Sequence, residues 1–128
     1  MNDEIIRSHV VRLLTWADAH VTFDEAVEAL PFELQGVKPP NLPYSAWQLL
    51  EHLRLTQGDI LEFCRNPEYR EPSWPHDYWP GSAAPPSEAA WHESVERFMA
   101  DRTELVGMAE DPSLDLAAEI PQGDGQTY

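Results

Sequence analysis

His52 is the residue of this chain best placed to do chemistry, because it stands at the edge of an apolar stripe on a predicted helix. On a helical wheel at about 100° per residue, Leu53, Gln57, Ile60 and Cys64 lie near the middle of the buried stripe. An imidazole at such an edge can point a ring nitrogen into a cleft between helices, where it can bind a metal or act as a base. The alternative is a partly buried histidine that is hydrogen-bonded to a carbonyl or a carboxylate.

Five other residues are weaker candidates. His20 and Asp24 stand four apart, so on one helix they would share a face and could chelate a ligand or form a solvated ion pair. Arg102 on a later helix, like Gln57, is not easily explained by apolar packing, and a buried guanidinium needs a carboxylate or a ligand anion. Structural pairing of Arg102 is the simpler interpretation. Cys64 in the stripe is interpreted as inert filling rather than as a nucleophile.

The familiar catalytic and metal-binding motifs do not occur in the sequence. His9, His76 and His92 have no partner at ligand spacing, and the chain contains no H-E-x-x-H, H-x-x-x-H, C-x-x-C or glycine-rich phosphate loop. The 23 carboxylates offer many pairs, but none is singled out by an apolar run around it.

Size and charge restrict the class of protein. The 128 residues predict one domain, 1–128, large enough to bury a core without disulfides. Eight Lys and Arg against 23 Asp and Glu give a net charge of −15, which disfavours nucleic acid and anionic membranes as partners. A lone cysteine, no membrane-length apolar run and an acidic amino terminus predict a cytoplasmic protein.

Three long helices are expected between proline-rich segments, which makes the class all-α. The first covers residues 3–30 and ends before Pro31, with apolar residues at helical spacing: Ile6, Val10, Leu13, Ala17, Val21 and Val27. The second begins near Ala46 after a capping box of Ser45 and Gln48, and ends at Asn66. Its stripe comprises Leu49, Leu50, Leu53, Ile60, Leu61 and Cys64.

The third helix follows an N-cap at Ser87 and closes at Asp111 before Pro112. Its stripe comprises Trp91, Val95, Phe98, Arg102, Leu105 and Ala109. Residues 72–80, rich in proline and aromatic side chains, are expected to form a packed loop that buries Trp74 and Trp79, or a loop that lines a substrate site. The apolar residues of the tail, 112–128, could lie along a groove. Three such helices leave one groove of a bundle open, so we expect self-association.

Residues 47–53 (WQLLEHL), 57–63 (QGDILEF) and 74–80 (WPHDYWP) resemble the DinB/YfiT-like superfamily. The similarity runs from the first helix to residues 123–127 (GDGQT). The resemblance implies a four-helix bundle of up-down-down-up topology. It also implies a divalent metal, such as Ni, Zn, Mn or Fe, held by one histidine on the second helix and an H-x-x-x-H pair on the fourth.

His52 matches the first of these ligand positions. The family's last helix would follow Thr127, so we expect it to be missing or only begun, together with two of the three ligands. The resemblance thus implies a relative of metal-dependent hydrolases or thiol transferases that is inactive as this chain alone, with an unidentified small-molecule substrate. The alternative is a non-catalytic acidic helical protein that acts as a homodimer or through another partner.

Overall fold

The computed structural model describes residues 2–15 and 19–128 and contains four α-helices within these ranges. They are α1 (Asp3–Thr15), α2 (Phe23–Ala29), α3 (Ala46–Arg65) and α4 (Glu88–Glu110), with short 3-10 turns η1 (Phe32–Leu34) and η2 (His76–Tyr78). Extended pairing in the described part is limited to one isolated bridge between Glu119 and Thr127. The all-α class is therefore confirmed. None of the described helices has the length and apolar character that a membrane span requires.

The ends of α3 and α4 confirm the capping signals of the sequence. The Ser45 hydroxyl accepts a hydrogen bond from the Gln48 backbone N–H, and the Gln48 side chain accepts one from the Ser45 N–H, which is a complete capping box. Ser87 likewise accepts from the Ala90 N–H at the start of α4. The helices stop at Asn66 and Asp111, each followed by proline, as expected.

The single helix predicted over residues 3–30 is wrong, because two shorter helices occupy this part of the chain. α2 has its own N-cap at Thr22, whose hydroxyl accepts from the Glu25 N–H and whose backbone is extended. Leu13 and Val21, which were expected in the buried stripe, are 84% and 69% exposed. Ala17 lies outside the described residues. The Thr-x-x-Glu signal therefore starts a new helix at this point, although the apolar residues keep helical spacing across it.

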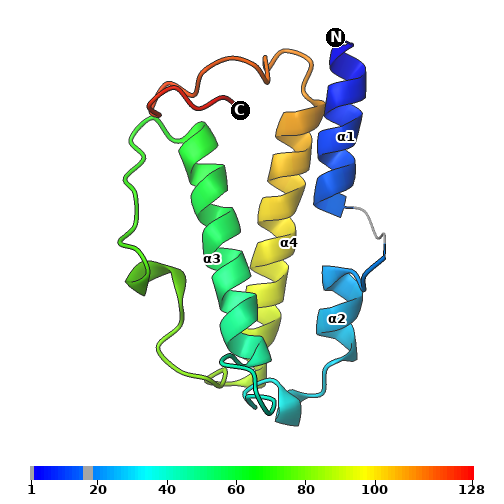
Figure 1. Cartoon of the computed structure of the whole chain (residues 1–128), viewed down its shortest axis with the longest axis vertical. Helices are drawn as coiled ribbons and strands as arrows, with labels where there is room; N and C mark the ends of the chain where they lie inside the picture. Colours follow the sequence, from blue (N-terminus) through cyan, green and yellow to red (C-terminus); the bar gives the residue numbers. More distant parts are fainter. Residues whose placement is uncertain (1, 16–18) are drawn as a thin grey trace.

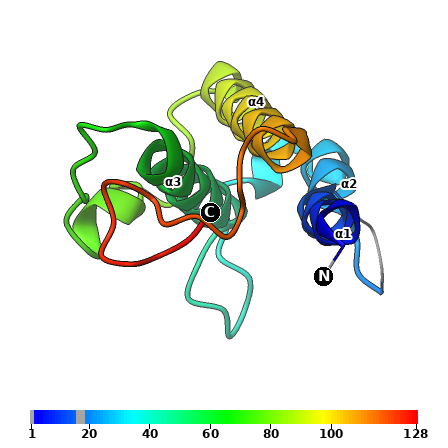
Figure 2. The same cartoon turned by 90° about the horizontal axis from the view of Figure 1, so that it is seen from above.

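The helices form an open arrangement rather than a closed ring. α1 and α2 run down one side of the molecule in Figure 1, while α3 and α4 both run upward, parallel to each other, joined by residues 66–87. Seen from above in Figure 2, α3, α4 and α1 lie along an arc. The core cluster of Trp47, Leu50 and Trp91 holds the lower ends of α3 and α4 together. Val27 of α2 and Leu30, directly after α2, pack against it. This core sits at one end of the helix pair and leaves the upper half to other contacts.

Arg7 fastens α1 to the upper end of α4. Its side chain is 10% exposed and forms an ion pair with Asp3 at 2.7 Å. The guanidinium also donates to the carbonyls of Ala109 (3.1 Å), Asp111 (2.8 Å) and Leu114. These carbonyls belong to the end of α4 and the residues after it, where helical partners are missing and the helix dipole is negative. The buried guanidinium of Arg7 therefore satisfies carbonyl groups at the end of α4 and fixes the start of the tail that crosses the top of the molecule.

Candidate functional site

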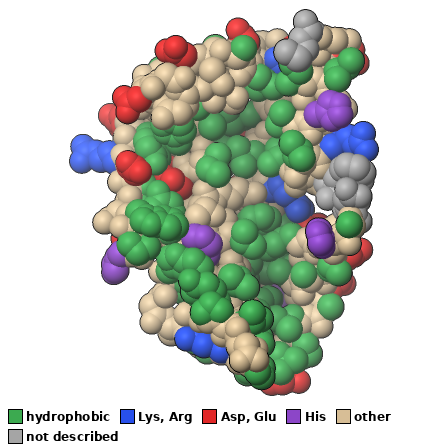
Figure 3. Space-filling view, viewed as in Figure 1, with side chains coloured by type: hydrophobic (Ala, Val, Ile, Leu, Met, Phe, Trp, Pro, Cys, Tyr) green, Lys and Arg blue, Asp and Glu red, His purple; other side chains and the backbone are tan. Residues whose placement is uncertain are grey.

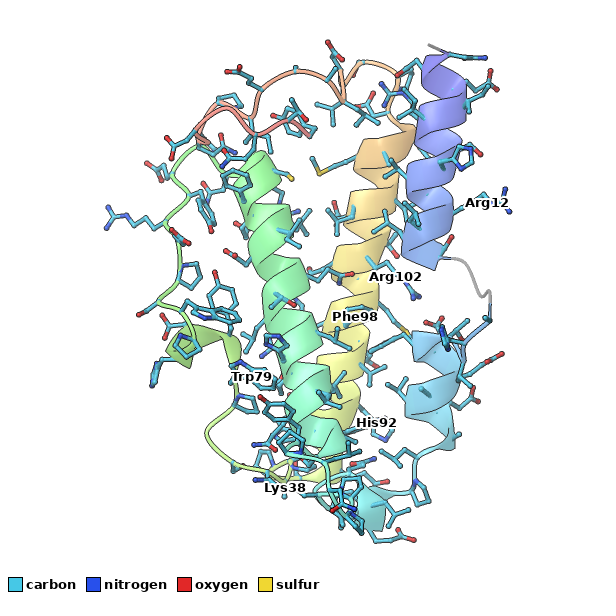
Figure 4. The ribbon with its side chains drawn as sticks, viewed as in Figure 1. Arg12, Lys38, Trp79, His92, Phe98 and Arg102 are labelled. Atoms are coloured by element: carbon cyan, nitrogen blue, oxygen red, sulfur yellow. The ribbon has the colours of Figure 1, made fainter. Side chains whose placement is uncertain are left out.

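His52 lies half-buried on α3, against the connection between α3 and α4. Its Nδ1 is 2.8 Å from the carbonyl oxygen of Tyr78. Its ring stacks on Trp79, with ring centres 3.8 Å apart and planes 6° from parallel. Figure 4 shows Trp79 on the side of α3 that faces away from α4. Because a carbonyl oxygen can only accept, Nδ1 carries the hydrogen, and in the neutral ring Nε2 keeps its lone pair.

A second polar cluster lies on the same flank of α3. Asp59 accepts hydrogen bonds from the hydroxyls of Tyr69 at 2.6 Å and Tyr78 at 2.7 Å, one on each carboxylate oxygen. Burial, together with the bond to Asp59, raises the pKa of Tyr78 to about 12. The same two causes raise the pKa of Tyr69. Both phenols therefore act as stable donors at neutral pH, and the cluster ties the connecting segment to α3.

The other flank of α3 borders an apolar groove of about 420 Å³ that lies between α3, α4, α1 and the tail. Figure 3 shows hydrophobic side chains gathered in a band over the face that α3 and α4 share. None of the lining side chains is charged; they belong to Val10, Leu14, Leu53, Thr56, Gln57, Ile60, Cys64, Phe98, Leu105, Met108, Ala109, Leu114, Leu116 and Tyr128. The open groove predicted from three long helices is present, although one of those helices is split.

The buried stripe predicted for the second helix is partly wrong. Leu50 and Leu61 are buried, but Leu49, Leu53 and Ile60 are 46%, 45% and 54% exposed. The helical period correctly places them on one face. Because the described elements do not cover that face, Leu53 and Ile60 line the groove instead of a core, and Leu49 is left exposed outside it.

The remaining polar candidates have structural roles. Arg102 forms a bidentate ion pair with Asp24, with N–O distances of 2.8 and 3.1 Å, which confirms the structural pairing. Figure 4 shows the Arg102 side chain extending from α4 toward the side of α2. This pairing holds the pKa of the Asp24 carboxyl below its usual value. His20 is exposed and precedes α2, so the shared helix face predicted for His20 and Asp24 is wrong. Gln57 donates to the Phe98 carbonyl at 2.7 Å and thereby links α3 to α4 across the groove floor.

Cys64, the two loop tryptophans and the tail were also singled out by the sequence, and their burial differs. Cys64 is partly buried in the groove wall, and burial raises the pKa of its thiol, which disfavours the reactive thiolate. Trp79 is half-buried against His52, but Trp74 is 66% exposed, so the expectation that both are buried is wrong for Trp74. In the tail, Leu114 and Leu116 line the groove and Ile120 is buried, as the apolar pattern predicted.

Sequence reasoning missed Arg7, Asp59 and the two tyrosines. Asp59 lies seven residues after His52, which places both on one side of α3, and this spacing was an available signal. Its partners Tyr69 and Tyr78 lie 10 and 19 residues away, beyond any helical spacing. Only the path of the connecting segment brings them to the carboxylate.

The residues present fit one position of a metal site but not a complete one. His52 offers a free Nε2, whereas no group of three His, Cys, Asp or Glu residues able to hold a metal occurs within residues 2–15 and 19–128. Comparisons with known proteins add no assignment, since no family model, no curated protein and no solved structure matches the chain.

Proposed function

We propose that this chain is a DinB-like protein, related to divalent-metal-dependent hydrolases or thiol transferases, in which His52 supplies one metal ligand. The observation that carries the proposal is the hydrogen bond from His52 Nδ1 to the Tyr78 carbonyl. Histidines that bind metals through one ring nitrogen almost always donate the other N–H to a carbonyl, a carboxylate or water. His52 is thus oriented as a ligand that binds through Nε2.

The directions of the helices support the same proposal. α1 runs opposite to α3 and α4, and the parallel pair is joined by the long segment 66–87. This order is compatible with the first three helices of an up-down-down-up bundle. In such a bundle the fourth helix would lie in the groove that Leu53 and Ile60 border.

A complete site would need further imidazoles, because zinc-type sites use three or four protein ligands. His52 lies beside the groove and does not line it. We therefore propose that a helix occupying the groove supplies them from an H-x-x-x-H pair at its border with α3, on the side nearest His52. A bound metal would act as a Lewis acid and lower the pKa of a bound water. Without that helix we expect no metal-dependent activity from residues 1–128.

The proposal is tested by adding a synthetic amphipathic helix with an H-x-x-x-H pair and titrating Zn²⁺ or Ni²⁺ by calorimetry. We expect a tight metal-binding step that requires both the peptide and His52. The variant His52→Ala should bind metal no better than the peptide alone. His92→Ala, which removes an exposed histidine of α4, is the matched control and should bind like the unaltered chain. Equal binding by both variants would contradict the role of His52.

A second candidate function, a non-catalytic homodimer, is favoured by the groove itself. Leu49, Leu53 and Ile60 are each about half exposed on one face of α3. Covering apolar surface stabilises an assembly by roughly 25 cal/mol per Å². The charge of −15 on each copy opposes the association, so a dimer of this kind should tighten as salt is added.

Light scattering at low and high salt distinguishes this candidate. A metal-free dimer that is strengthened by salt and lost in Ile60→Glu supports it. Ile5→Glu is the matched control, because Ile5 on α1 is 55% exposed, like Ile60 at 54%, but does not line the groove. A monomer at all salt concentrations would exclude the homodimer.

A further inference from the structure

We propose that Tyr78 and Asp59 are positioning residues for His52, which hold its ring in the single tautomer and orientation that presents Nε2. This inference rests on the proposed role of His52 as a ligand. It concerns residues that the family resemblance does not assign, and it follows from how one tyrosine is attached to α3.

Tyr78 is bound to α3 at two points. Its backbone carbonyl accepts from His52 Nδ1 at 2.8 Å, and its hydroxyl donates to Asp59 at 2.7 Å. His52 and Asp59 are seven residues apart, about two helical turns, and so lie on the same side of α3. Tyr78 therefore spans these two turns, and the bond to Asp59 limits how far its carbonyl can move from His52.

Further contacts restrict the movement of Tyr78 and of the His52 ring. Tyr78 ends the turn η2, where its N–H donates to the Pro75 carbonyl at 3.1 Å, and only 7% of the residue is exposed. Trp79 stacks on the His52 ring and also on Tyr44, with ring centres 4.5 Å apart in the second pair. A 180° flip of the imidazole would break the hydrogen bond, and turning the ring out of its plane would break the stack as well.

As a consequence, Nε2 of His52 is preorganised as a ligand in the metal-free chain. A histidine free to change tautomer or orientation must be ordered when it binds, and this ordering reduces affinity. Outer partners of a metal-bound histidine typically contribute a factor of about 10 to 100 in metal affinity. Asp59, with no direct bond to the imidazole, acts through the position of Tyr78.

The test is the tautomer of His52 in the metal-free chain, read from ¹⁵N chemical shifts and two-bond ¹H–¹⁵N couplings at a pH where the ring is neutral. His52→Ala identifies the signals among the five histidines. We expect the Nδ1–H form to dominate. In Tyr78→Phe, which removes only the hydroxyl, the ratio of Nδ1–H to Nε2–H should fall by roughly two- to tenfold, the factor that the net contribution of one hydrogen bond supports.

Tyr69→Phe is the matched control, because it also removes a phenol hydroxyl from Asp59 but leaves the bond between Tyr78 and Asp59 in place. It should leave the His52 tautomer ratio unchanged. Equal shifts in both phenylalanine variants, or no shift in either, would overturn the proposal. If Tyr78→Phe does not fold, Asp59→Asn provides a second test, because the weaker neutral acceptor should lower the ratio in the same direction.

The measurement separates this inference from the proposed function, because it uses no metal. A dominant Nε2–H form in the unaltered chain would refute the positioning role even if metal binding through His52 were observed. Conversely, a dominant Nδ1–H form that depends on Tyr78, together with no metal binding in the presence of the H-x-x-x-H helix, would refute the metal site and leave the positioning intact.

Discussion

Asp59 and Ile60 are neighbours in the sequence but face two flanks of α3 that differ in how completely the chain satisfies them. On the first flank, both oxygens of Asp59 accept phenol hydroxyls, and His52 is bonded and stacked. On the second flank, Ile60 is 54% exposed beside a groove without charged lining residues. The polar groups on the first flank thus find their hydrogen-bond partners within the chain. The apolar flank instead exposes surface that another helix could cover.

The largest expected effect is on the free energy of unfolding. Asp59→Ala leaves two phenols without their charged acceptor, and we expect a loss of about 2 to 4 kcal/mol. Ile60→Ala removes a half-exposed side chain, and we expect a loss of about 1 kcal/mol or less. Urea unfolding of the two variants provides the measurement. A larger loss for Ile60→Ala would show that the groove is covered in solution and that the contrast is wrong.

A smaller effect is expected at alkaline pH. Burial and Asp59 raise the pKa of Tyr78 from its ordinary value near 10 to about 12. Between these two values the folded chain keeps a proton that the unfolded chain releases, so the free energy of unfolding should fall as the pH rises through this window. Below about pH 10 the contribution is fully present.

Urea unfolding at several pH values across this window measures the slope. Tyr78→Phe should make the slope shallower without abolishing it, because the pKa of Tyr69 is raised as well. An identical slope in the variant would show that the hydroxyl of Tyr78 does not contribute to the pH dependence, and would argue against a satisfied polar flank.

The smallest effect concerns the apolar flank. A neutral fluorescent dye is suitable, because the charge of −15 would repel an anionic one. We expect the dye to bind the groove and its fluorescence to drop several-fold in Leu53→Glu, since a charge on the groove wall disfavours an apolar ligand. Leu13→Glu is the control, because Leu13 is 84% exposed on α1 and does not line the groove. Equal fluorescence in both variants would exclude the groove as the binding site.

Local signals were predicted well and long-range ones were not. The capping box at Ser45, the N-cap at Ser87 and the stops at Asn66 and Asp111 depend on residues within a few positions, and all are confirmed. The pairing of Arg102 with a carboxylate was predicted from the cost of a buried cation, but its partner Asp24 was not. The helix over residues 3–30 failed because a second start signal at Thr22 was overlooked.

The candidate site shows the same division. The place of His52 beside a stripe on one helix predicts either a ligand or a histidine bonded to a carbonyl or a carboxylate, and the structure shows the bond to a carbonyl. The identity of that carbonyl, the tyrosines on Asp59 and the four bonds of Arg7 were not predictable, since each joins residues that the helical period does not bring together. Whether His52 binds a metal stays a prediction.

The amino-acid sequence by itself determined an acidic, all-α chain, the ends of α3 and α4, and the face of α3 on which Leu53 and Ile60 lie, because caps and helical periods act over one or two turns. Only the tertiary structure decided which faces are covered. The path of residues 66–87 brings Tyr78 onto one flank of α3, while the arc of helices leaves the other flank open. Burial is a property of neighbours in space, and those neighbours come from distant parts of the chain.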